Sequence, residues 1–80
     1  MNCMTTNYEA DLVKKGGHDL YITGCSHYEG YDDSTRYFIS VFDFDLADEI
    51  EVVESTEDAL FWQFLAVLER YKAEGWVEQR

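Results

Sequence analysis

The sequence predicts a single α+β domain in which an antiparallel sheet of about four strands packs against one long C-terminal helix, in the order β-β-β-β-α. Three observations support this fold class: short runs of alternating apolar and polar residues before residue 54, apolar residues at helical spacing after it, and a glycine pair between the first two runs. A chain of 80 residues has room for one small core. We therefore treat residues 1–80 as one domain, of which residues 1–6 are expected to be flexible.

The first two predicted strands form a hairpin. Residues 8–14 alternate weakly, and residues 19–23 are rich in β-branched and aromatic side chains, which favour strands. Gly16 and Gly17 lie between these runs, and such a glycine pair favours a tight antiparallel turn. Gly24 is expected to mark a bulge or the end of the second strand.

Residues 26–35 have the composition of a loop. Asp32 and Asp33 favour a turn there, because short side-chain oxygens accept hydrogen bonds from nearby backbone amides. Tyr28 and Tyr31 lie in the same segment and would present flat apolar surfaces, which protein interfaces favour.

Residues 36–45 form the clearest predicted strand, because their side chains alternate along the run. Both sides of the run are apolar over residues 37–42, which is typical of a central strand. The pattern does not determine which face of the sheet the helix covers. If the face of Tyr37, Ile39 and Val41 stays uncovered, that face would itself be a binding surface. A turn at residues 46–49 and a fourth strand at residues 50–53 complete the predicted sheet.

The helix follows directly. Ser55 or Thr56 is expected to cap its start, and Gly75 is expected to end it in a left-handed conformation. Apolar residues recur at helical spacing between these ends. These residues are Leu60, Phe61, Phe64, Leu65, Leu68 and Tyr71. Trp76 and Val77 would add a short fifth strand or close the core.

The charge of the chain excludes several function classes. Seventeen Asp and Glu against six Lys and Arg give a formal net charge of −11. Binding to nucleic acid needs clustered Lys and Arg, and an anionic membrane surface would repel this chain. No run approaches the roughly 20 apolar residues of a membrane span, and the start lacks the features of a signal peptide. We expect a cytoplasmic protein with Cys3 and Cys25 as free thiols.

Three patterns partly match a catalytic pair, a zinc site and a calcium loop, but none of them predicts such a site. Cys25 and His27 could meet on an extended segment, but no oxyanion-stabilising motif accompanies them. Cys3, His18, Cys25 and His27 lack the paired short spacings of structural zinc sites. Residues 43–54 carry carboxylates at several positions of a calcium loop but lack its glycine and its entering helix. We therefore expect no catalytic residue, no cofactor and no metal.

The acidic residues are concentrated in one run, since eight of them fall between Asp43 and Asp58. Like charges at this density repel one another, so that a compensating benefit such as attraction to a cationic partner is expected. Carboxylates two residues apart on a strand lie ~6–7 Å from each other and approximate the intervals between phosphates. The predicted partner contacts are Asp43, Asp45, Asp48, Glu49, Glu51 and Glu54, followed by Tyr28, Tyr31, Asp32 and Asp33.

In size, charge and the acidic run from Asp43 to Asp58, the chain resembles two groups of small proteins. One group is the phage-encoded inhibitors of host defence, the anti-CRISPR and anti-restriction proteins, several of which are acidic and imitate the phosphates of DNA. The other is the immunity proteins that cap a basic nuclease toxin. The resemblance covers no residue-level motif and therefore assigns no site residue.

The expected function is that of a non-enzymatic acidic inhibitor. It would bind a positively charged nucleic-acid-binding surface of a host protein, such as a CRISPR-Cas or restriction complex, in the host bacterial cytoplasm if the chain is phage-encoded. An immunity protein is one alternative. A structural or assembly protein that forms homo-oligomers through Trp62 and the helix is the other. We expect Trp62 in the core, and an exposed Trp62 would instead belong to a contact surface. The expected state is a monomer or a weak homodimer, with no direct contact to nucleic acid or membrane.

Overall fold

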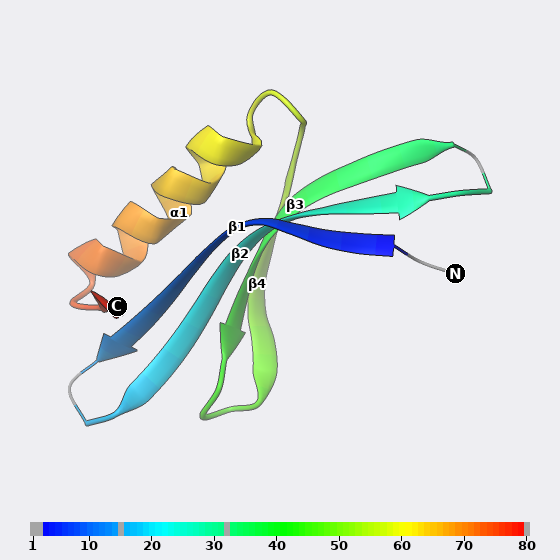
Figure 1. Ribbon diagram of the computed structural model, residues 1–80. Helices are drawn as coiled ribbons and strands as arrows, with labels where there is room; N and C mark the ends of the chain where they lie inside the picture. Colours follow the sequence, from blue (N-terminus) through cyan, green and yellow to red (C-terminus); the bar gives the residue numbers. More distant parts are fainter. Residues whose placement is uncertain (1–2, 15, 32, 80) are drawn as a thin grey trace.

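The computed structural model describes residues 3–14, 16–31 and 33–79. It contains β1 (Cys3–Lys14), β2 (His18–Glu29), β3 (Ser34–Asp43), β4 (Asp48–Ser55), α1 (Leu60–Ala73) and β5 (Val77–Gln79) (Figure 1). The α+β class is confirmed. The sheet has five strands instead of about four, and the helix has 14 residues and precedes β5 instead of ending the chain.

The five strands form one sheet in the order β4-β3-β2-β1-β5, and every neighbouring pair is antiparallel. The first four strands therefore follow one another as a simple meander. The chain then crosses one face of the sheet as α1 and returns as β5 beside β1 (Figure 1). The short strand expected at Trp76 and Val77 is present as β5, which begins at Val77.

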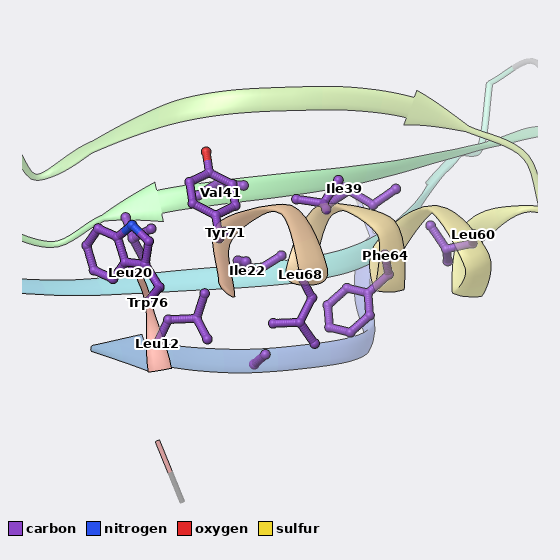
Figure 2. Close-up of a cluster of buried hydrophobic side chains, with 12 residues drawn as sticks. Leu12, Leu20, Ile22, Ile39, Val41, Leu60, Phe64, Leu68, Tyr71 and Trp76 are labelled. Carbon is purple, nitrogen blue, oxygen red and sulfur yellow. The ribbon is translucent and has the colours of Figure 1, made fainter. Parts of the chain in front are cut away.

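The core lies between α1 and one face of the sheet. Every second residue of the three central strands points into it, and α1 contributes the complementary apolar stripe (Figure 2). The fully buried members are Leu12, Leu20, Ile22, Ile39 and Val41. The helix therefore covers the face of Ile39 and Val41, against which Tyr37 also packs, so that this face is not an uncovered binding surface.

The hairpin between β1 and β2 forms as predicted. Gly16 and Gly17 both have positive φ, +102° and +82°, a conformation that glycine adopts without a steric penalty. Gly24 lies inside β2, and the bulge is on the opposite strand, between Thr6 and Tyr8. A Cβ atom on Gly24 would lie 3.2 Å from Cδ2 of Tyr8, so that any side chain here would press on the Tyr8 ring.

Two segments expected to be irregular are strands. Residues 3–6, expected to be flexible, belong to β1 and pair with β2. Most of the expected loop 26–35 is also paired, because β2 continues to Glu29 and β3 begins at Ser34. Tyr28 therefore stands on the strand ladder, whereas Tyr31 lies in the turn between β2 and β3. Residues 1–2 of the expected flexible start lie outside the described residues.

The helix begins later than predicted. Thr56 does not cap it: its Oγ1 accepts a hydrogen bond from the Ala59 amide at 3.2 Å and closes a turn that precedes α1. The N-cap is Ala59, which makes no side-chain hydrogen bond. The C-terminal prediction is confirmed, since Gly75 follows the helix with a φ of +104°. Within the described ranges, no helix is long and apolar enough to cross a membrane.

Trp62, expected in the core, instead lies on the outer side of α1 and is 69 % exposed. Its ring contacts Phe61 at a centroid distance of 5.3 Å and is absent from the core cluster. We expect Trp62→Ala to change the free energy of unfolding by less than about 1 kcal/mol in urea titrations. Trp76→Ala is the matched control, because Trp76 is buried and its loss should cost about 3–5 kcal/mol. A large loss for Trp62→Ala that does not depend on protein concentration would contradict the exposed placement.

Candidate functional site

The face of the sheet opposite α1 is covered by no other described element, and we call it the open face. Strand alternation directs Phe38, Ser40 and Phe42 of β3 to this face, because Ile39 and Val41 point into the core. Tyr21 stands opposite Phe42 in the ladder. One side of this small sheet is therefore left as surface.

Three aromatic side chains form a stripe on the open face, which we call the aromatic stripe: Tyr21, Phe42 and Phe44. The rings of Phe42 and Phe44 meet edge to face at 5.1 Å, and those of Tyr21 and Phe44 lie 6.3 Å apart. Phe44 is 53 % exposed. Tyr21 and Phe42 are partly buried, so that the three mutually packed rings form a partly exposed apolar surface on the strand ladder.

Acidic residues of β1 and β2 border the aromatic stripe. The hydroxyl of Tyr21 donates a hydrogen bond to Glu9 at 2.8 Å. This hydrogen bond, together with partial burial and the charges of Glu9 and Asp11, raises the pKa of Tyr21 to about 12. Tyr21 therefore stays neutral at physiological pH and holds the Glu9 carboxylate beside the stripe.

A hollow of about 500 Å³ opens at this border, and we call it the acidic hollow. Asp11 and Asp19 line it together with Phe44 and Gln79. Leu12 and Leu20, which follow the two aspartates on β1 and β2, complete the lining. Asp11 pairs with Tyr21 and Asp19 with Val13, so that the two aspartates are diagonal neighbours on one face, roughly 7–8 Å apart. Neither carboxylate forms a hydrogen bond or an ion pair with any residue that the structure describes.

A second hollow of about 210 Å³ lies near the other end of the open face. It is lined by His27, Arg36, Phe38, Val52 and Glu54. Arg36 forms an ion pair with Glu54 in its wall. This end of the face is therefore electrically balanced, whereas the acidic hollow is not.

The prediction that Asp43 is a surface contact is wrong. Asp43 is only 4 % exposed and its carboxylate is used inside the protein. Its Oδ1 accepts hydrogen bonds from the amides of Asp45 and Leu46 at 2.9 and 3.1 Å, which fixes the turn between β3 and β4. His18 Nε2 lies 3.0 Å from its Oδ2.

Burial acts to raise the pKa of Asp43, but its hydrogen bonds outweigh this effect. The Leu46 amide, His18 and the Asp45 amide all favour the ionised carboxylate, so that the pKa lies below its ordinary value of 3.8. Asp43 therefore stabilises the fold as an anion and is not free to contact a partner.

Most of the remaining acidic run is also paired within the protein. Glu51 points to the helix face, where it accepts a hydrogen bond from Tyr71 at 2.8 Å and pairs with Arg70. Glu49 contacts Ser40, Glu54 contacts Arg36, and Asp45 lies 3.1 Å from His18. Of the acidic residues predicted as contacts, Asp48 alone among those the structure describes has no hydrogen-bonded or ionic partner. The run is therefore divided between two faces of the sheet.

The second set of predicted contacts lies at the tip of the β2–β3 hairpin. The hydroxyl of Tyr28 donates to Asp33 at 2.7 Å, and that of Tyr31 donates to Glu29 at 3.0 Å. These hydrogen bonds raise the pKa of both tyrosines. Tyr31 is 88 % exposed, so this tip can reach a partner. Asp32 lies outside the described residues.

Sequence reasoning missed the acidic hollow and its border. Glu9 and Asp11 precede the acidic run, and Phe44 was seen only as part of a strand. The available signal was the Gly16-Gly17 turn, because a hairpin closed there places Asp11 and Asp19 on the same face of neighbouring strands.

One group of side chains has the composition of a metal site. Ligand atoms of His18, Asp43 and Asp45 lie within 4.8 Å of one another. The hydrogen bonds of Asp43 to the turn amides and the contacts of His18 with both carboxylates already account for this arrangement. The zinc set weighed from the sequence is not assembled, since His18 and His27 lie nine residues apart on β2, roughly 30 Å along the strand.

Comparison with protein-family models, with curated proteins and with solved structures gave no match.

Proposed function

We propose that this protein is a non-enzymatic acidic inhibitor that binds a positively charged surface of another protein, such as the nucleic-acid-binding surface of a CRISPR-Cas or restriction complex. The observation that supports this most is the open face, where an exposed aromatic stripe borders carboxylates that lack internal partners. Aromatic side chains are enriched at the centres of protein interfaces, and charged side chains at their borders steer association.

The charge of the chain favours a basic partner over a second copy. With a net charge of −11, two copies meeting through their open faces would bring Glu9, Asp11 and Asp19 against the same residues. Like charges brought together in this way oppose association. A surface rich in Lys and Arg would instead find both apolar area and unpaired carboxylates.

The spacing of these acids suits a site that normally binds phosphates. Glu9 and Asp11 are two residues apart on β1 and share the open face, which separates them by ~6–7 Å. Asp19 adds a third carboxylate on the neighbouring strand. Lys and Arg that bind successive phosphates accept carboxylates at similar intervals.

The test measures displacement of DNA. Proteins retained by the immobilised chain from a bacterial lysate are eluted with duplex DNA and purified, and their complexes with DNA are titrated with the chain. We expect at least one of them to release its DNA, and its affinity for the chain to fall steeply between about 50 and about 200 mM salt.

Two outcomes contradict the proposal: retained proteins that keep their DNA at saturating chain, and complexes whose affinity does not depend on salt. A matched variant sharpens the comparison. Glu9→Gln with Asp11→Asn should release the partner, whereas Asp58→Asn with Glu74→Gln removes the same charge elsewhere and should not. If the chain is instead an immunity protein, the retained protein that releases its DNA would be a toxic nuclease.

A homo-oligomer remains the second candidate function because Trp62 and Phe61 are both exposed on α1. Here the contact would be the helix, not the open face. Light scattering over a hundredfold concentration range distinguishes the two, since a constant monomer mass rules out the oligomer and a mass that falls to the monomer value in Trp62→Ala supports it.

A further inference from the structure

We infer that the acidic hollow is the recognition site for an arginine side chain of the partner, held between the Asp11 and Asp19 carboxylates and packed against the ring of Phe44. This inference rests on the proposed function and names the chemical group that the open face recognises. It concerns a surface that the acidic run did not indicate.

The first argument is the distribution of free charge. The side chains of the chain's few cations and of its tyrosines engage most of the acidic residues that the structure describes. The described acids whose carboxylates form neither a hydrogen bond nor an ion pair are Asp11, Asp19, Asp48, Asp58 and Glu74. Asp11 and Asp19 are the pair that lines one hollow, so that this hollow is where the protein leaves negative charge uncompensated beside apolar surface.

The second argument is shape. Asp11 and Asp19 come from neighbouring strands and stand on the same face as diagonal neighbours. A planar guanidinium carries five N–H donors in a fixed fork and can reach carboxylates on two sides at once. An ammonium group is a compact point charge and cannot fill the same span.

The third argument is the aromatic wall. Phe44 lines the hollow, is half exposed, and is held by the rings of Tyr21 and Phe42. A guanidinium stacks on an aromatic ring while its edge remains free to donate hydrogen bonds. Gln79 of β5 closes the hollow from the other side with a side chain that accepts and donates hydrogen bonds.

The experiment compares two synthetic peptides of equal length and charge, hexaarginine and hexalysine, by calorimetric titration at fixed salt. We expect the wild type to bind hexaarginine about tenfold more tightly than hexalysine, because two carboxylates and a ring favour the guanidinium. Asp11→Asn with Asp19→Asn should abolish this preference. Phe44→Leu should reduce it while leaving all charges in place.

Asp58→Asn with Glu74→Gln is the charge-matched control and should keep the preference for arginine. Equal affinity of the wild type for both peptides overturns the inference. An equal loss of the arginine preference in the Asp11→Asn with Asp19→Asn variant and in the control also overturns it. Either result leaves the proposed function intact if the chain still displaces DNA from a retained protein. Failure of that displacement, with the arginine preference present, would instead overturn the proposed function alone.

A measurement on the wild type alone guards against a variant that does not fold. N-acetyl-arginine amide is titrated into ¹⁵N-labelled protein, with N-acetyl-lysine amide as the reference. We expect saturable shifts at the amides of Asp11, Asp19, Phe44 and Gln79 with the arginine compound. Shifts spread over all acidic residues, or centred on the β2–β3 hairpin tip, would overturn the inference.

Discussion

Leu12→Ala is expected to lower the free energy of unfolding by about 2–5 kcal/mol, because it leaves a cavity in a core that cannot collapse around it. Leu12 is fully buried on β1, faces α1, and pairs with Leu20 of β2 and Glu78 of β5 (Figure 2). A domain of this size has a total stability of only about 4–12 kcal/mol. The variant should therefore be partly unfolded at 37 °C.

Urea unfolding followed by the fluorescence of Trp76, which belongs to the same core cluster, measures this loss. Leu46→Ala is the matched control: the same atoms are removed from a side chain that is 67 % exposed in the β3–β4 turn. It should change stability by less than about 0.5 kcal/mol. Comparable losses in the two variants would contradict the placement of the core.

The fold class and most of the elements followed from local pattern. The Gly16-Gly17 turn, the apolar stripe of α1 and the left-handed Gly75 depend on interactions within a few residues, and all three are present. The start of α1 was misplaced because Thr56 has the right side chain for a cap and uses it for a preceding turn. The composition of residues 26–35 predicted a loop, but most of these polar residues pair as strands because the β2–β3 ladder continues through them.

The candidate site was harder to predict because it depends on which charges meet. A count of carboxylates identifies the run from Asp43 onward, but not that His18 approaches Asp43 or that Arg70 and Tyr71 reach Glu51. Those contacts join residues 19–25 positions apart and follow from the packing of α1 and the register of the sheet. The density of charge in the sequence therefore supports only the hypothesis of a basic partner, and it does not show which carboxylates are left without a partner inside the protein.

Asp43→Asn is expected to lower the melting temperature by several degrees at about pH 6, and this loss should disappear in acid. Asparagine keeps an oxygen that accepts the amides of Asp45 and Leu46, so that the substitution removes the charge opposite His18 and little else. The pKa of Asp43 lies below its ordinary value in the folded protein, so the folded state binds fewer protons than the unfolded state. The stabilisation is therefore complete above the ordinary pKa and is lost as pH falls through the folded pKa.

Thermal unfolding of both proteins from about pH 6 to about pH 2.5 measures the difference, which should shrink below about pH 4. The difference is the informative quantity, because protonating the other carboxylates also relieves repulsion in a chain of net charge −11. Asp48→Asn controls for this, since Asp48 pairs with Asp43 in the ladder, is exposed, and should not destabilise the protein at any pH. A loss at Asp43 that persists unchanged in acid would show that its shape, not its charge, holds the turn. Neutralising the acidic run is therefore not one experiment, because Asp43 supports the fold on which the open face depends, whereas the exposed Asp48 of the same run forms no hydrogen bond or ion pair with a described residue.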